Sequence, residues 1–200
     1  MTALSAPTLD LYDTWAQTVR EFVAEGDRHI EGSGNWNLPD HLAVDTSRAT
    51  CAMYVDILAA LGTEEASSED AYGGHGRVPS DYWWITDAPG SAAQVVGFIA
   101  VRHRLNDFLR NIGGHIGYSI RPSRRREGHA TRALDLALGR CRELGLGRAL
   151  VTCDDTNAAS AATIERCGGV LEDKRPRNDA GDLTRRYWIE LGSVDLSRRV

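Results

Sequence analysis

The run from Arg124 to Thr131 (RRREGHAT) constrains the fold most, because it sets a basic, glycine-containing turn between a strand and a helix. Residues 117–120 (GYSI) predict the strand, and leucines at helical spacing between 134 and 144 predict the helix. The first turn of a helix presents unpaired backbone N–H groups and about half of a positive elementary charge. The segment therefore predicts an anion site, and phosphate is the expected ligand.

Gly128 favours this interpretation, because a side chain there would keep the backbone away from phosphate oxygens, and Ala130 adds little bulk. Two familiar nucleotide loops are absent: the sequence contains no GxxxxGK[ST] and no GxGxxG after a strand. Their absence argues against a P-loop NTPase and against a Rossmann dinucleotide site. Taken alone, the turn also fits a basic helix start that faces solvent.

Residues 94–170 resemble the Gcn5-related N-acetyltransferase (GNAT) family. The pyrophosphate loop of that family, [QR]xxGx[GA], is matched by residues 125–130 (RREGHA). A second family motif, a strand followed by an asparagine and a short helix closed by glycine, is matched by residues 148–153 (RALVTC) and 157–169 (NAASAATIERCGG). Asn157 is expected to cap that helix and Gly168 to end it. Residues 113–130 (GGHIGYSIRPSRRREGHA) together with 151–169 (VTCDDTNAASAATIERCGG) are similar to a bacterial branch of predicted acetyltransferases.

The resemblance implies an α/β fold of the α+β, mixed-sheet kind: a central, mostly antiparallel sheet with a splayed parallel strand pair, flanked by helices. The splayed strands are the ones that end at Ile120 and Cys153. At 200 residues and 42% hydrophobic, the chain is long enough for one domain with a proper core, spanning residues 1–200. We assign residues 1–90 to the acceptor side, 91–175 to the acetyl-CoA-binding core and 176–200 to a C-terminal strand region.

Periodicity places the remaining elements around these motifs. Helices are expected from about 11 to 23 and from 46 to 61, in addition to the two motif helices. Residues 27–44 and 62–80 are predicted loops that build the acceptor side. Strands are expected at 4–8, 82–86, 95–103, 115–120, 148–153, 170–171 and 185–191.

The resemblance also implies a cofactor site, in which the pantetheine arm of acetyl-CoA lies between the splayed strands. Main-chain groups near Tyr118 and Ile120 are expected to bond its amides, and an amide of Tyr118 or Ser119 to polarise the thioester carbonyl. Asn157 and Ser160 are expected beside the pantetheine. The loop residues expected to bind the cofactor, mainly through main-chain N–H groups at the pyrophosphate, are Arg125, Arg126, Glu127, Gly128, His129, Ala130 and Thr131.

Transfer to an amine requires the neutral amine, and a lysine-like amine with a pKa of about 10.4 is only ~0.1% neutral near pH 7.4. His115 is the first candidate for the base, with His103, Asp154 and Asp155 as alternatives. The glutamate that some relatives carry one residue earlier is replaced here by Gly114. A buried His115 ring that bonds the backbone is an equally good interpretation.

The leaving thiolate raises a second question. Many relatives place a tyrosine seven residues after the motif asparagine to protonate sulfur, and Ile164 stands there. Ser160 is the catalytic candidate for this role; Tyr187 or water are alternatives, and a thiol of pKa about 8.5 also allows the thiolate to leave unprotonated. Direct transfer through a tetrahedral intermediate is a simpler expectation than an acyl-enzyme on Cys153 or Cys167.

Charge divides the chain into two parts. Residues 1–90 carry 15 acidic and 4 basic side chains, and residues 91–200 carry 13 acidic and 19 basic ones. The basic part contains the motifs, as a polyanionic ligand favours, and the acidic part predicts a cationic acceptor, with Trp36, Trp83 and Trp84 as stacking surface. The acidic side chains also fit a surface that serves solubility alone.

We therefore expect an acetyl-CoA-dependent N-acetyltransferase that acts on a primary amine of a small molecule, such as a polyamine-like or aminoglycoside-type compound. Two alternatives stay open. One is a non-catalytic acyl-CoA-binding sensor or assembly module of the same fold, and the other is a protein N-acetyltransferase. The sequence names neither the acceptor nor the oligomeric state, and a homodimer is among the possibilities.

Several classes of partner are not expected. A net charge of −5 without interleaved basic and aromatic residues argues against nucleic acid. The four cysteines form no CxxC pair and no cage with histidine, so no metal is expected. Residues 1–8 lack the basic start of a signal peptide, and no apolar run reaches the ~18 residues of a membrane span. A cytoplasmic location without membrane contact is therefore expected.

Overall fold

A computed structural model describes residues 1–68 and 76–192. Residues 69–75 of the predicted acceptor loop 62–80 and residues 193–200 of the predicted C-terminal strand region lie outside the described residues. Within them, seven strands form one sheet, in the order β1-β2-β3-β4-β5-β7-β6. The strands are β1 (Ala3–Ser5), β2 (Ser80–Thr86), β3 (Val95–Arg102), β4 (Ile116–Ile120), β5 (Arg148–Asp154), β6 (Val170–Pro176) and β7 (Leu183–Glu190). The α-helices are α1 (Tyr12–Ala24), α2 (Arg48–Ala60), α4 (His129–Glu143) and α5 (Ala158–Arg166).

The sheet is antiparallel except between β4 and β5, which run parallel at its centre. These two strands share one register pair, Ile116 with Val151, and then diverge. The predicted fold class, a mixed sheet with a splayed parallel pair and flanking helices, is confirmed. The divergence leaves main-chain groups of β4 without a strand partner on that side, which is the feature that positions the site.

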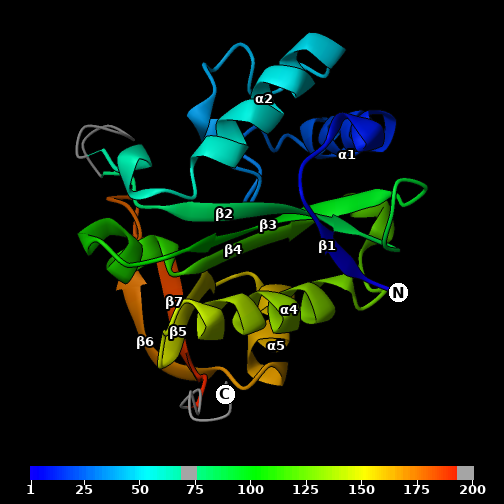
Figure 1. Ribbon diagram of the computed structural model, residues 1–200. Helices are drawn as coiled ribbons and strands as arrows, with labels where there is room; N and C mark the ends of the chain where they lie inside the picture. The colour runs from blue at the N-terminus through cyan, green and yellow to red at the C-terminus, as the bar shows by residue number, and fades with distance from the viewer. Residues whose placement is uncertain (69–75, 193–200) are drawn as a thin grey trace, which may run out of the picture.

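Helices cover both faces of the sheet, α1 and α2 on one and α4 and α5 on the other (Figure 1). Because β3 is covered on both faces, it is buried along almost its whole length, in keeping with its continuous apolar sequence VVGFIAV. One core, between α1, α2 and the sheet, centres on Trp15, Trp84 and Phe98. The other, beneath α4 and α5, includes Leu134 and Ile164.

This packing corrects part of the expected acceptor surface. Trp84 is fully buried and stacks on Trp15 with ring centroids 6.1 Å apart, and Trp83 packs against the core beneath α4. The Trp84 indole is therefore inaccessible to a ligand, and the Trp83 indole is partly buried on the other face of the sheet. Successive residues of β2 point to opposite faces of the sheet, so Trp84 packs in the core beneath α1 and α2, and Trp83 packs against the core beneath α4.

The helix ends follow local chemistry. Asn157 caps α5 through its Oδ1, which accepts from Ser160 N at 3.0 Å, and Gly168 ends this helix with a left-handed φ of 90°. Both predictions are confirmed. Short turns fill the connections: 3-10 turns at Leu9–Leu11, Asn35–Asn37, Glu64–Ala66 and Pro122–Arg124, and a π-helical turn at Leu109–Gly113.

Within residues 1–68 and 76–192, no helix is long and apolar enough to cross a bilayer. In the same residues, no group of three or more His, Cys, Asp or Glu side chains is arranged to hold a metal ion.

Candidate functional site

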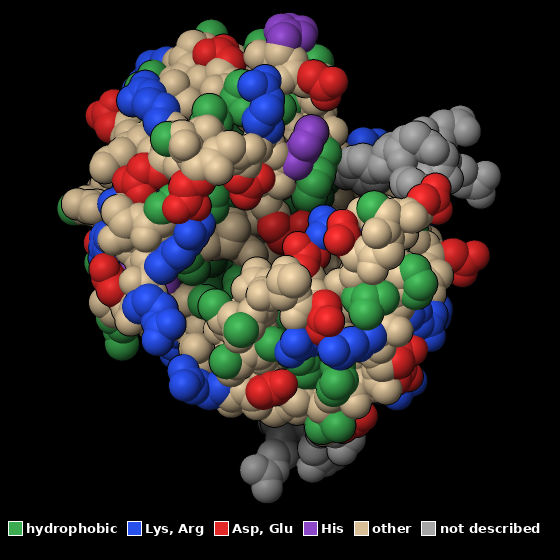
Figure 2. Space-filling view, turned by 180° about the vertical axis from the view of Figure 1, so that it is seen from behind, with side chains coloured by type: hydrophobic (Ala, Val, Ile, Leu, Met, Phe, Trp, Pro, Cys, Tyr) green, Lys and Arg blue, Asp and Glu red, His purple; other side chains and the backbone are tan. Residues whose placement is uncertain are grey.

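A cleft of about 1520 Å³ lies where β4 and β5 diverge, and it runs from the loop after α1 to the loop before α4. Figure 2 views the molecule from behind Figure 1 and shows this face hollowed near its centre, with acidic and basic side chains around the hollow. The predicted cofactor residues that line the cleft are Tyr118, Ser119, Ile120, Arg125, Arg126, Gly128, His129, Ala130, Thr131, Asn157 and Ser160. Glu127 does not line it.

Main-chain groups of β4 face the gap between the diverging strands. Arg121 N donates to Val96 O of β3 at 2.8 Å. Because hydrogen-bonding groups alternate along a strand, those of Tyr118 and Ile120 point the other way, toward β5. Pairing with β5 is limited to Ile116 in this region. An extended ligand with amide groups could therefore pair with β4 in place of a strand.

The loop before α4 has the backbone of an anion site. Arg126 and Gly128 both have left-handed φ values, 69° and 83°, on either side of Glu127. Alternation of this kind gathers successive N–H groups into a concave surface that binds anions. A Cβ added at Gly128 would meet no atom within 4 Å, so this side of the loop is open. The N-terminus of α4, which begins at His129, adds its unpaired N–H groups. These features fit a diphosphate.

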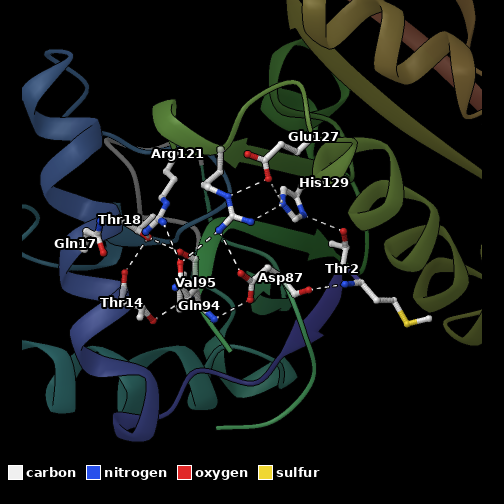
Figure 3. A network of polar contacts seen from close by, with 12 residues as sticks. Thr2, Thr14, Gln17, Thr18, Asp87, Gln94, Val95, Arg121, Glu127 and His129 are labelled. Atoms are coloured by element: carbon white, nitrogen blue, oxygen red, sulfur yellow. Dashed lines mark hydrogen bonds and ion pairs between the residues drawn. The ribbon is translucent and has the colours of Figure 1, made fainter. Parts of the chain in front are cut away.

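Side chains of the loop turn back toward the protein and brace it (Figure 3). Arg124 lies between Asp87, at 3.2 Å, and Glu127, at 3.0 Å. His129 Nε2 lies 3.2 Å from the same Glu127 carboxylate, and its Nδ1 lies 2.9 Å from Thr2 Oγ1. The Glu127 and His129 side chains are thus paired with other groups of the protein, although the Glu127 side chain remains 45% exposed.

Arg125 ties the loop to the rest of the site. Its guanidinium pairs with Glu25, just after α1, at 2.8 Å, and its Nε donates to Ile120 O at 3.1 Å. The carbonyl of Ile120 therefore already accepts one hydrogen bond, and the carbonyl of Tyr118 also faces the gap. Arg125 thereby links the loop to the end of β4 and to the end of α1.

Two hydroxyl groups meet across the gap, which the sequence did not indicate. Tyr118 OH lies 3.0 Å from Ser160 Oγ, in the first turn of α5. Burial raises the pKa of Tyr118 to about 12, so the phenol stays protonated near neutral pH. Tyr187, the other donor considered, is fully buried and donates to Glu165 at 3.2 Å, away from the cleft wall. Burial raises the pKa of the nearby Cys153 thiol to about 11, which disfavours a thiolate.

Residues 36–170 match the acetyltransferase (GNAT) domain family. The chain belongs to this family. Family membership makes it an acetyl-CoA-dependent acyltransferase, and the GNAT fold accounts for the splayed strands and the basic loop described above. No curated protein has significant sequence similarity to the chain.

Solved structures of other GNAT acetyltransferases share the fold. The microcin C7 self-immunity acetyltransferase MccE, in complex with acetyl-CoA and AMP, aligns with a TM-score of 0.62 at 14% identity over 94% of this chain and 92% of that one. Mycobacterium smegmatis RimJ, in complex with CoA-disulfide, aligns with a TM-score of 0.63 at 18% identity, over 94% of this chain and 81% of that one. RimL, a ribosomal L7/L12 α-N-protein acetyltransferase, aligns with a TM-score of 0.61 at 16% identity, over 94% of this chain and 93% of that one.

In this GNAT protein, His115 does not face the cleft, and its geometry disagrees with the predicted role as base. The ring is 5% exposed, lies edge-on to Trp188, and its Nδ1 accepts a hydrogen bond from Leu150 N at 2.9 Å. A base needs a free lone pair near the substrate, and here the Nδ1 lone pair is used in the core. His115 instead locks the start of β4 to β5.

The alternative bases lie in different places. His103 pairs with Asp81 at 3.0 Å, and neither side chain lines the cleft. Asp154 lines the cleft and pairs with Arg177. Asp155 pairs with Lys174 and Arg185, outside the cleft wall, and those cations hold the pKa of its carboxyl below the usual range.

The other end of the cleft is lined by residues of the loop 27–44, which was predicted to build the acceptor side; of these residues, only Trp36 was named individually from the sequence. Asp27, His29, Glu31 and Trp36 all line the cleft. The rings of His29 and Trp36 stack, with centroids 5.9 Å apart and planes 6° apart. Burial raises the pKa of Asp27, and repulsion from Glu31 adds to the effect. A composition count predicts acidity in this half but not which carboxylates meet the cleft.

Proposed function

We propose that this GNAT protein transfers the acetyl group of acetyl-CoA directly to a primary amine of a small, cationic molecule. The observation that carries the proposal is the polarity of the cleft. One end is a concave, basic loop of main-chain N–H groups, and the other end holds the carboxylates of Asp27 and Glu31. The gap between β4 and β5 joins the two ends.

The donor end suits acetyl-CoA. Main-chain N–H groups from Arg126 to Thr131 would bind the diphosphate, and charge-assisted bonds of this kind contribute roughly 1.5–3 kcal/mol each. Main-chain groups of Tyr118 would pair with the pantetheine. An amide there would also polarise the thioester carbonyl, and loss of one such oxyanion donor typically costs about 10²–10³ in kcat.

The leaving sulfur has a hydroxyl donor at hand in the Tyr118–Ser160 pair. A phenol with a pKa near 12 is a weaker acid than a thiol, whose ordinary pKa is about 8.5. Tyr118 would therefore stabilise the thiolate by donating a hydrogen bond rather than by giving up its proton. The Ser160 hydroxyl, which lies within hydrogen-bond distance of the phenol, would be a second hydrogen-bond donor beside it.

The acceptor end suits an amine. Carboxylates attract an ammonium group, and the stacked rings of His29 and Trp36 offer a flat surface beside them. A cleft of this size admits a small molecule without requiring an extended partner surface.

A protein N-terminus is the second candidate acceptor. RimL, which shares the fold, is described as an α-N-protein acetyltransferase. An N-terminal α-amino group has an ordinary pKa of about 7.7–8.0, so it needs less help to become neutral than a lysine-like amine.

The test is release of CoA thiol from acetyl-CoA with a panel of amines: spermidine, kanamycin, tyramine and a short peptide with a free N-terminus. Turnover of one of the small amines at a rate well above the peptide is expected. Preference for the peptide would favour the second candidate. Binding of acetyl-CoA without turnover of any amine would favour a sensor.

Substitution of Gly128 tests the loop. Gly128→Ala adds a methyl group on the open side of the loop, so the Kd for acetyl-CoA should rise at least about tenfold, or 1.4 kcal/mol. Gly145→Ala is the matched control, because Gly145 also has a left-handed φ, 78°, and open space around it, but lies after α4. Both variants should lose about 1 kcal/mol of stability. Equal acetyl-CoA affinity in the two variants would contradict the assignment.

A further inference from the structure

One carboxylate of the acceptor loop sits directly on the sheet. A Cβ added at Gly117 of β4 would overlap Glu31 Oε1, and the three nearest atoms to it all belong to the Glu31 side chain. Any side chain at position 117 would therefore displace the carboxylate. The glycine lets Glu31 reach the strand whose next residues, Tyr118 and Ser119, border the gap.

The backbone holds Glu31 in this place from two sides. Ser119 Oγ donates to Glu31 O at 2.7 Å, which fastens the loop to β4. Gly32 follows with a left-handed φ of 77°, and a Cβ there would come within 2.5 Å of Gly117 O. The loop can pass this close to β4 only because both segments have a glycine, Gly32 and Gly117, where they cross.

The carboxylate is oriented by an arginine that is itself fixed. Arg102 Nη2 lies 3.3 Å from Glu31 Oε1, and Arg102 Nη1 donates to Gly113 O at 2.9 Å. The Glu31 side chain is nevertheless 46% exposed and lines the cleft. The other titratable residues of this loop that line the cleft are Asp27, whose carboxyl interacts electrostatically with Glu31, and His29. Glu31 is thus placed, oriented and accessible.

We propose that Glu31 binds the ammonium group of the acceptor and accepts the proton that the nitrogen loses during attack on the thioester. This inference rests on the proposed amine acetylation and assigns its acceptor-side residue. Gly117 is the positioning residue, because it creates the space that the carboxylate occupies.

A carboxylate is a weaker base than a lysine-like amine by about six pKa units, so it cannot hold the proton of a free ammonium group. Glu31 instead pairs with the ammonium on binding, and the amine loses its first proton to solvent. The nitrogen lone pair then forms the N–C bond, which makes the remaining N–H protons acidic, and Glu31 takes one of them. The C–S bond breaks with its electron pair on sulfur, and the Glu31 proton passes through solvent to the thiolate, so that the products are the amide and CoA thiol.

The first experiment compares Glu31→Gln with Glu143→Gln, using the panel amine that the wild-type protein turns over fastest. Glu143 is a matched control because its side chain is 65% exposed on α4 and lies outside the cleft wall. Glu31→Gln should lower kcat/KM for the amine at least about 100-fold, with part of the loss in kcat, as expected for a general base. The Kd for acetyl-CoA and the Tm should stay as in the wild type, and Glu143→Gln should change none of these.

The second experiment uses the glycine. Gly117→Ala should reproduce the loss of amine turnover, because its methyl group displaces the carboxylate, and adding Glu31→Gln to it should cost little more. Full additivity of the two substitutions, or an unchanged kcat/KM in folded Glu31→Gln, overturns the inference and leaves the acetyltransferase proposal standing. A rise in KM with kcat unchanged overturns the role as base. Failure of the wild-type protein to acetylate any amine overturns the proposed function itself.

Discussion

His115 illustrates, at the scale of one residue, how burial decides the role of a side chain. Its ring bridges β4 and β5 through Leu150, and burial, together with the positive charges of Arg102 and Arg110, lowers its pKa from 6.5 to about 4. The folded protein therefore holds this ring neutral. Protons bind more readily to the unfolded chain between about pH 4 and 6.5, so stability is complete above that range and falls as the pH falls through it.

Comparison of wild type with His115→Gln tests this role. In the wild type, titration of the His115 ring should lower the free energy of unfolding at about pH 5 by on the order of 2 kcal/mol relative to pH 7. Glutamine can still accept from Leu150 N but does not titrate, so the variant should lack this part of the pH dependence. The measurement is urea unfolding of both proteins at each pH. A constant difference in unfolding free energy between the two proteins would contradict the structural role.

Gly128 and Glu31 show which site residues could be predicted from the sequence and which could not. The loop at Gly128 was predictable because its chemistry depends on local spacing: a basic turn, a glycine and a helix start within a few residues. Glu31 was not, because its position depends on Gly117 and Arg102, which are distant in the sequence and meet it only in the folded sheet. The roles assigned to both sites stay predictions until they are tested.

At the scale of elements, α5 carries one wall of the cleft, and its first turn depends on its cap. Asn157→Ala removes the acceptor for Ser160 N, and loss of such a cap costs about 1 kcal/mol. Because Ser160 lines the cleft and contacts Tyr118, fraying of this turn should raise the KM for acetyl-CoA by up to about fivefold, the ratio equivalent to that energy.

Ser47→Ala is the control for this variant. Ser47 caps α2 by accepting from Thr50 N at 3.2 Å, and α2 lies on the opposite face of the sheet from α5. Both substitutions should lower the Tm by similar amounts, while only Asn157→Ala should change the KM for acetyl-CoA. A KM that rises equally in both variants would assign the effect to general destabilisation.

The elements differ in how well they could be predicted. Strands buried in the sheet, such as β3 and β5, have apolar sequences and were found with bounds close to those observed. β6 extends from Val170 to Pro176, well beyond the predicted residues 170–171, because it is an exposed edge strand with a polar sequence, LEDKRP, that carries no apolar alternation. The π-helical turn at Leu109–Gly113 also lacked a recognisable pattern.

At the scale of the whole molecule, the two oppositely charged halves of the sequence meet at one cleft. The acidic half supplies the loop after α1, and the basic half supplies β4, β5 and the loop before α4. The order of the elements between β4 and α5 was predictable from the two motifs, and most of the surrounding helices and strands from periodicity. The tryptophans of β2 were assigned to the wrong surface, because a sequence does not say which of two cores a β-strand faces.

This separation of charge predicts that salt weakens binding of acetyl-CoA. The ligand is a polyanion, and at the proposed site the loop would offer it helix N–H groups and arginines. The screening length of such charges shrinks from about 10 Å at 0.1 M salt to 3 Å at 1 M. The Kd for acetyl-CoA should rise several-fold between about 0.05 and 0.5 M NaCl.

Dephospho-CoA provides the comparison, since it keeps the diphosphate and pantetheine but lacks the terminal phosphate. Its Kd should rise less steeply with salt than that of CoA if the arginines act through charge, whereas contacts made by main-chain N–H groups to the diphosphate persist in both. Calorimetric titrations of both ligands across the salt series give the two slopes. A flat Kd for CoA would mean that geometry, rather than the positive charge of this half of the chain, holds the ligand.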